Sequence, residues 1–191
     1  MRRWIARYRF VLLALFGSVG AVAAFAPAMA QTEREAAALD ALFAQLKSAP
    51  DETVARQIAQ QIWIYWTTPA DPVLASKMQD VLMLRQRAAF PDAITLLDDI
   101  VVDYPTYAEG WNQRATLYYL LGNNEASLAD IEKVLEFEPR HFGALVGRAV
   151  IYKSRGEQSL AIEAMTRALA IHPFLVERSL FPELQEEITR A

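Results

Sequence analysis

Apolar residues recur at helical spacing along most of this 191-residue chain. In the stretch 33–47, Leu39, Leu42, Phe43 and Leu46 stand at positions i, i+3, i+4 and i+7, which places them on one side of a helix. No stretch alternates apolar and polar residues with a period of two, so the pattern predicts no β-sheet. The chain divides instead into predicted helices over residues 33–47, 52–66, 73–87, 92–103, 106–121, 125–137, 141–155 and 157–171.

The segments between these helices contain residues that end or begin a helix. Runs 67–72 and 88–91 are predicted to be breaks, because they combine small residues with proline. Thr106 is a favourable N-cap for the helix 106–121. The later helices are followed by residues that do not continue a helix, namely Pro105, Gly122, Pro139, Gly156 and Pro173.

Two consecutive helix pairs, residues 108–141 and 142–175, share one pattern position for position. Small residues recur at the two positions where the helices of a pair must approach closely, and proline recurs where the second helix must end. Since one pair cannot bury its own apolar face, neighbouring pairs must stack. The residues that carry the pattern are Trp111, Ala115, Tyr118, Gly122 and Pro139 in the first pair, and Ala149, Tyr152, Gly156, Ala161 and Pro173 in the second.

The unit before these two carries only half of the pattern. Its second helix matches, with Ala93 and Leu97 at the expected spacing, whereas its first helix has Lys77 in place of the tryptophan. The helix 52–66 carries a weaker form of the same pattern. Residues 33–66 are therefore predicted to be a degenerate helix pair that caps the N-terminal end of the repeat array. Residues 174–191 are predicted to cover the last repeat.

The pattern resembles the tetratricopeptide repeat (TPR) family over residues 74–175, most closely over residues 108–175. The resemblance implies an all-α, right-handed solenoid of antiparallel helix pairs, with about three repeats between an N-terminal helical hairpin and a C-terminal capping helix. The predicted organisation is a signal peptide at 1–30, the hairpin at 31–72, a divergent repeat at 73–107, repeats at 108–141 and 142–175, and the capping helix at 176–191.

Residues 1–30 have the three parts of a secretory signal peptide. Four arginines precede the uncharged run Phe10–Phe25, and Ala28-Met29-Ala30 supplies a small-x-small cleavage signal. The run is shorter than the roughly 20 apolar residues of a spanning helix. The sequence predicts export and a periplasmic location after cleavage near Ala30; the alternative is a chain anchored in the inner membrane and facing the periplasm. Leader, repeats and acidic character together resemble the small exported TPR proteins of Gram-negative bacteria.

Charge and composition narrow the classes of function. The formal net charge is −4, and loss of the leader, with four arginines and no acid, makes it −8. An acidic chain lacks the basic footprint of a nucleic-acid-binding protein, so no nucleic-acid partner is expected. The TPR resemblance implies a protein or peptide partner. The chain has no cysteine, and its two histidines, His141 and His172, lie near turn prolines, where a structural role is expected. No catalytic, metal or cofactor pattern is found, and the chain is predicted not to be an enzyme.

The TPR resemblance implies a concave face lined by the first helix of each repeat. Positions 2, 5, 9 and 12 of that helix lie on one side. The predicted partner-binding groove comprises Leu82, Arg85, Glu109, Asn112, Thr116, Tyr119, Val146, Val150 and Lys153, with Met78 also on its apolar floor. The clamp with which chaperone-binding members hold a C-terminal carboxylate is absent, because Gln113, Gly143 and Gly147 stand at its positions.

The resemblance therefore implies a non-catalytic periplasmic adaptor that binds a partner segment in this groove, in cell-envelope assembly or maintenance. The alternative is an inner-membrane-anchored structural subunit of an envelope complex that keeps its leader; only then is membrane contact expected. In a competing arrangement, the protein's own termini fill the groove, as terminal segments of repeat proteins often do.

Overall fold

The computed structural model describes residues 36–184, so the predicted leader and residues 185–191 of the predicted capping helix lie outside the described residues. The chain divides into two compact units, 1–37 and 38–191, and nearly all described residues belong to the second. Every regular element among them is helical, which confirms the predicted all-α class.

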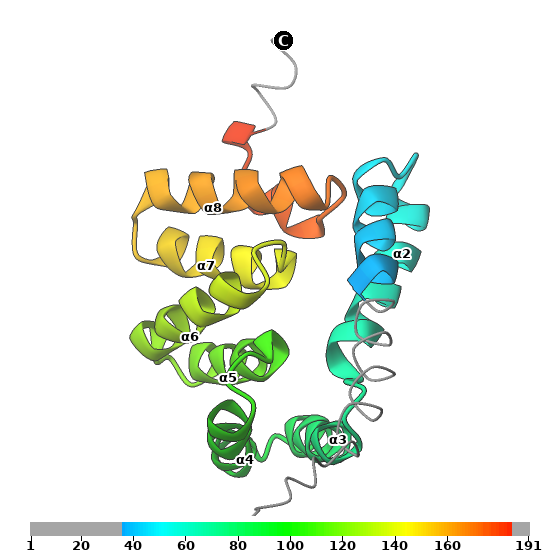
Figure 1. Cartoon of the computed structure of the whole chain (residues 1–191). Helices are drawn as coiled ribbons and strands as arrows, with labels where there is room; N and C mark the ends of the chain where they lie inside the picture. The colour runs from blue at the N-terminus through cyan, green and yellow to red at the C-terminus, as the bar shows by residue number, and fades with distance from the viewer. Residues whose placement is uncertain (1–35, 185–191) are drawn as a thin grey trace, which may run out of the picture. The chain divides into compact units, whose positions relative to one another are not determined.

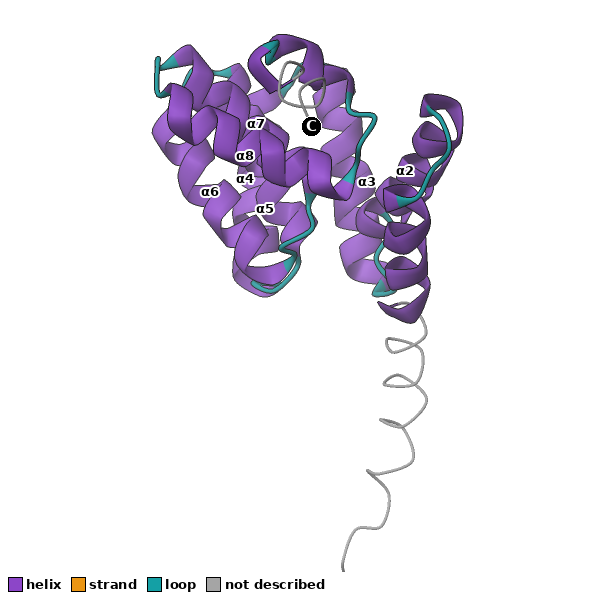
Figure 2. Cartoon of the chain, turned by 90° about the horizontal axis from the view of Figure 1, so that it is seen from above, coloured by secondary structure: helices purple, strands orange, loops and turns teal. Residues whose placement is uncertain are grey.

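A first helix covers residues 36–47, and three antiparallel pairs follow α2 along the chain (Figure 1). Figure 2 shows the same helices from above, joined by short loops. Each helix whose two ends are described begins and ends within two residues of its predicted bounds. The bounds are α2 Glu52–Thr67, α3 Pro72–Gln86, α4 Phe90–Asp103, α5 Ala108–Leu120, α6 Asn124–Phe137, α7 Phe142–Ser154 and α8 Gln158–Ile171, followed by a short 3-10 helix, Val176–Leu180.

The turn between the two helices of a pair is the same in all three pairs. Gly122 and Gly156 have left-handed backbones with φ of +78° and +75°, and Ala88, at the same position of the preceding repeat, has φ of +56°. In each turn the next N–H donates to a carbonyl five residues earlier, at 2.8–2.9 Å. The unit 73–107 is therefore a structural repeat, although the first half of its sequence departs from the pattern.

Two local predictions at helix starts were wrong. Phe90 and Pro91 were assigned to a break but form the first turn of α4, where proline is accepted because the first N–H groups of a helix have no partner. Thr106 was expected to cap the next helix, but α5 begins after Tyr107, whose side chain makes no capping hydrogen bond within the described chain. Both errors concern one or two residues and leave the helix order unchanged.

Replacing Ala88 with glycine is expected to raise the free energy of unfolding by about 0.5–1 kcal/mol, because glycine adopts the left-handed conformation without the Cβ strain that alanine carries. Urea denaturation measures the change. The same substitution at Ala129, an exposed residue in the middle of α6, is the matched control and is expected to lower stability by about 1 kcal/mol. Equal effects at the two positions would contradict the strain at Ala88.

Small residues let the two helices of a repeat approach closely, as the sequence predicts. Ala115 and Ser127 are buried between α5 and α6, and the Ser127 hydroxyl donates to the Ala115 carbonyl at 2.8 Å. Ala149 and Ala161 occupy the same positions between α7 and α8 and are fully buried. Of the other signature residues, Trp111, Tyr118 and Tyr152 are half-buried within α5 and α7, and Pro139 and Pro173 lie just beyond the ends of α6 and α8.

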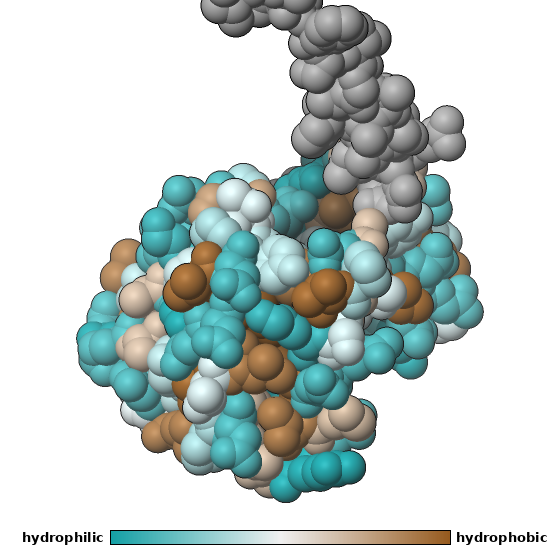
Figure 3. Space-filling model, turned by 60° about the horizontal axis from the view of Figure 1, so that its bottom comes forward, coloured by the Kyte–Doolittle hydropathy of each residue, from teal (hydrophilic) through white to brown (hydrophobic). Residues whose placement is uncertain are grey.

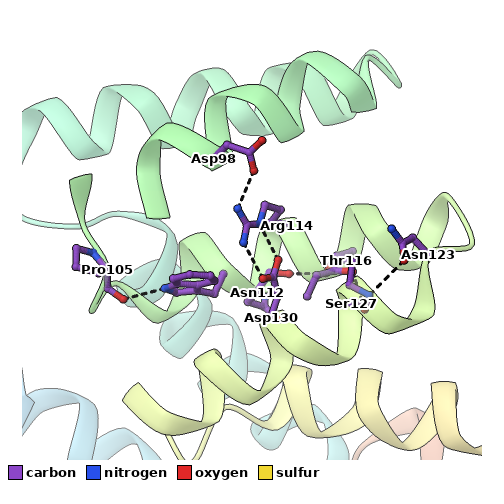
Figure 4. Close-up of polar contacts among 11 residues, drawn as sticks. Asp98, Pro105, Asn112, Arg114, Thr116, Asn123, Ser127 and Asp130 are labelled. Atoms are coloured by element: carbon purple, nitrogen blue, oxygen red, sulfur yellow. Dashed lines mark hydrogen bonds and ion pairs between the residues drawn. The ribbon is translucent and has the colours of Figure 1, made fainter. Parts of the chain in front are cut away.

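An arginine joins each of the last two repeats to the one before it. Arg114 of α5 binds Asp98 of α4 at 2.7 Å and both carboxylate oxygens of Asp130 at 2.7 and 2.8 Å (Figure 4). Arg148, at the same position of the next repeat, binds Glu132 of α6 at 2.7 Å. The last repeat has alanine at the position of Asp130, and the Nε atom of Arg148 is buried without a partner in the described chain. The Arg114–Asp98 and Arg148–Glu132 pairs thus link successive repeats, whereas Arg114–Asp130 joins the two helices of one repeat.

The N-terminal hairpin, residues 38–67, packs on the last repeat. Leu46, Ile62 and Trp66 share one core with α7, α8 and Phe181. The hairpin therefore lies against the C-terminal repeat, and the expected position as a cap on the N-terminal end of the array was wrong. Its contacts run along one edge of the stack, formed by the residues that precede α5 and α7.

Two residues of that edge explain the docking position. Tyr107 and His141 immediately precede α5 and α7, at the same position of successive repeats, and both contact Trp66. The Tyr107 hydroxyl donates to the Trp66 carbonyl at 2.6 Å, and the His141 ring stacks on the indole with centroids 4.0 Å apart and planes 9° apart. One tryptophan of the hairpin thus contacts the same position of two successive repeats.

Candidate functional site

Three hollows border the first helices of the repeats, and the central one shares lining residues with each of the other two. The central cavity has a volume of about 530 Å³ and is enclosed by α2, α3, α5, α7 and residues 172–177. The apolar cavity, about 250 Å³, lies between α5, α6 and α7. The side cavity, about 400 Å³, lies between α3, the start of α4 and the end of α5. Asn112, Thr116, Gly143, Val146 and Glu177 line both of the first two, and Arg85 lines the first and the third.

Seven of the nine predicted groove residues line these cavities. Asn112, Thr116 and Val146 lie where the central and apolar cavities meet, whereas Tyr119 and Val150 line the apolar cavity alone. Arg85 and Leu82 line the side cavity. The helical spacing that defined the groove therefore brings most of its members together, from three different helices.

Two predicted groove residues lie elsewhere, and so does Met78. Glu109 is 1% exposed and forms part of a buried polar network. Lys153 lies over the ring of Phe181, with its Nζ 4.8 Å from the centroid. Met78 is fully buried in the core between α3 and α4, so its place on the groove floor was wrong.

The buried network is centred on the Glu109 carboxylate. Asn112 Nδ2 donates to Oε2 at 3.0 Å, and Gln113 Nε2 donates to Oε1. The His141 ring lies 3.0 Å from Oε2 through its Nε2, and its Nδ1 accepts the Ala144 backbone N–H at 3.1 Å. Because Nδ1 accepts, the ring proton belongs on Nε2, which donates to Glu109. His141 thus has two structural roles: its Nδ1 caps α7, and its Nε2 hydrogen-bonds to the Glu109 carboxylate.

This network continues outward to the cavities through Gln113. The Gln113 amide donates to Glu109 through its nitrogen and accepts from Arg85 Nη1 through its oxygen. Burial lowers the pKa of the Arg85 guanidinium, and the Glu109 carboxylate opposes that shift. Burial also lowers the pKa of His172, which lines the central cavity from the end of α8. This side of the repeats therefore joins a buried polar network to an open, partly apolar hollow.

The family and sequence comparisons agree with this architecture. Residues 108–141 match the tetratricopeptide repeat family. Over 135 residues, 71% of its length, the chain is 41% identical to a curated TPR repeat-containing protein of Rhizobium etli, and the match covers 66% of that relative. The chain belongs to the tetratricopeptide repeat family. This TPR chain is also similar to the crystal structure of MamA, at 17% identity with a TM-score of 0.48, covering 69% of this chain and 76% of that one.

TPR repeats suggest a protein–protein interaction module, with protein partners for this chain. Among residues 36–184, no group of histidine and acidic side chains is arranged to hold a metal ion, and no helix is long and apolar enough to cross a membrane. The TPR framework is typically a non-catalytic scaffold, and its cavity-lining groups offer hydrogen bonds and apolar contacts.

Part of the lining of the TPR groove escaped the sequence analysis. Trp63 of α2 and residues 174–177 close the central cavity, in line with the arrangement in which the protein's own segments enter the groove. A signal for this was present in Gly143, a glycine in the first turn of α7. A Cβ there would lie 2.9 Å from the Trp63 ring, so only glycine leaves room for the hairpin.

Proposed function

We propose that this TPR protein is a non-catalytic periplasmic interaction module that binds a segment of a partner protein on its concave side. The observation that carries the proposal is the junction of the central and apolar cavities at Thr116 and Val146. A groove with an apolar floor and a few amide and hydroxyl groups suits an extended or helical protein segment. We propose a role in cell-envelope assembly or maintenance.

The apolar cavity supplies the anchoring position. Val146, Val150 and Ile151 line it together with the ring of Tyr119, which is 41% exposed. A large apolar side chain of the partner would fill this space and displace its water, which is the usual source of affinity at the centre of an interface. Elsewhere the surface is mixed: on the face in Figure 3, apolar side chains lie in separate patches among polar ones.

The leader at residues 1–30 supports the proposed location, because its three parts match a cleavable export signal. Mass spectrometry of the chain isolated from its own host tests this point. A chain that begins at Gln31 supports a periplasmic protein. A chain that keeps Phe10–Phe25 would favour the alternative, an inner-membrane-anchored structural subunit of an envelope complex.

Truncating both Tyr119 and Val150 to alanine is expected to reduce partner recovery by about tenfold or more, since buried contacts at an interface centre contribute most of the affinity. Recovery is measured by affinity purification from the periplasm with quantitative mass spectrometry. Leu160→Ala is the matched control, because Leu160 is 43% exposed on α8 and lines none of the three cavities.

Site-directed photo-crosslinking tests whether the partner binds in the groove or elsewhere on the surface. A photoreactive side chain at position 119 is expected to capture the partner, whereas one at position 160 is not. Equal recovery by the double variant and the wild type, or crosslinking only at position 160, would place the partner outside the groove.

A further inference from the structure

Arg85 differs from the other half-buried arginines of the described chain. Arg114, Arg140 and Arg148 each form an ion pair with at least one carboxylate, at 2.6–3.0 Å. Within residues 36–184, no carboxylate lies within ion-pair distance of Arg85. A guanidinium stays charged at neutral pH, so this partly buried charge lacks a direct counter-ion among these residues.

The surrounding contacts hold this guanidinium toward open space. Its Nη1 donates to the Gln113 amide oxygen, and that amide is itself held by Glu109. The nearest buried acid, Glu109, already accepts hydrogen bonds from Asn112, Gln113 and His141. The side chain of Arg85 lines both the central and the side cavity, which leaves the rest of its planar donor fork for a ligand.

The other charged side chains of the central cavity do not neutralise the positive charge of Arg85. Arg56 and Glu52 line it as a mutual pair, 2.7 Å apart. Glu177 lies where the central cavity meets the apolar cavity, and no lysine or arginine in the described chain is paired with it. The groove therefore carries a positive group toward α3 and a negative group toward α7, with apolar walls between α5 and α7.

We propose that Arg85 binds the carboxylate of an aspartate or glutamate in the partner segment, while a large apolar side chain of the same segment fills the apolar cavity. This inference rests on the proposed function and names the chemistry of its partner. Glu177 repels a second acid at the apolar end, so the charge pattern also fixes the direction in which the segment lies. Guanidinium and carboxylate pair through two parallel hydrogen bonds, which gives the contact its selectivity.

Peptide display with the purified full chain tests the proposal. A random peptide library is selected against wild type, Arg85→Gln and Arg87→Gln. The control residue Arg87 carries the same charge at the end of the same helix and lines none of the three cavities. Wild type and the Arg87 variant are expected to enrich peptides that combine an acidic residue with a large apolar one. The Arg85 variant is expected to enrich the apolar residue alone.

Synthetic peptides then locate the carboxylate. A selected peptide with an amidated C-terminus is expected to bind wild type about tenfold or more tightly than its acid-to-amide version, and Arg85→Gln is expected to remove that difference. If the difference depends on a free C-terminus, the chain end is the ligand and the side-chain proposal is overturned.

The outcomes separate this inference from the proposed function. If selected peptides lose binding to the Tyr119 and Val150 double variant but show no acidic preference, the groove function stands and the role of Arg85 is overturned. If no peptide is enriched, or binding ignores the double variant, both proposals are overturned. A thermal melt of Arg85→Gln, followed by circular dichroism and compared with wild type, verifies that the variant is folded.

Discussion

Replacing Trp66 with alanine is expected to lower the free energy of unfolding by about 3–5 kcal/mol, the range for removing a large aromatic side chain from a core. Trp66 is 7% exposed, stacks on His141 and packs against Phe142 and Phe43 with ring centroids 5.3 and 6.0 Å away. Its Nε1 has no hydrogen-bond partner among the described residues, so the loss comes from packing. Urea denaturation followed by far-ultraviolet circular dichroism measures it.

A second measurement shows which part of the chain loses stability when Trp66 is replaced. Hydrogen exchange of the amides in residues 52–67 is expected to accelerate more than that of α5 and α6, because Trp66 fastens the hairpin to the last repeat. Tyr65→Ala is the matched control: its ring is 42% exposed on the same helix, and the expected change is below about 1 kcal/mol. Similar losses for the two variants would show that the hairpin is not held through Trp66.

Replacing Glu109 with alanine is expected to destabilise the protein by about 3 kcal/mol, because three buried donors lose their acceptor. Its carboxylate accepts hydrogen bonds from Asn112, Gln113 and His141, and all of these side chains are buried. Each orphaned donor costs about 1–3 kcal/mol, partly offset because a buried charge is removed as well. The change is read from urea denaturation.

The control for this variant is Glu136→Ala on α6, where the side chain is 56% exposed and pairs with Lys133. Its expected effect is below about 1 kcal/mol, as for other surface ion pairs. Glu109→Gln should fall between the two, because the amide keeps one acceptor but adds a donor beside donors. A loss for Glu109→Ala no larger than for Glu136→Ala would contradict the network.

Local pattern was sufficient to predict the helices, the repeat and most of the residues that share the cavities between the repeats. Helical periodicity, proline and glycine act over a few residues, so the order and bounds of the helices follow from sequence directly. The groove residues Thr116, Tyr119, Val146 and Val150 follow from the same periodicity, because equivalent positions of stacked repeats face one side.

Contacts between distant parts of the chain could not be predicted from local sequence pattern. The position of the hairpin depends on the shape of Trp66 against Tyr107 and His141, a fit that no periodicity encodes. Glu109 stands at a predicted groove position of α5, but its carboxylate is buried. It accepts hydrogen bonds there from three neighbouring side chains. The break at residues 88–91 was predicted, but the left-handed backbone of Ala88 was not, because glycine marks that position only in the later two repeats.

The docking of the hairpin along Tyr107 and His141 has a consequence for the length of the array. In an open solenoid each repeat contacts only its neighbours, so repeats can be gained or lost at little cost. Here α2 contacts the edges of two successive repeats, and Arg140 of the loop before α7 reaches Asp40 of the hairpin at 2.6 Å. Inserting or deleting one repeat between α3 and α8 would move the last repeat away from the hairpin. The number of repeats is thereby fixed, and the two ends of the array are expected to unfold together as one cooperative unit.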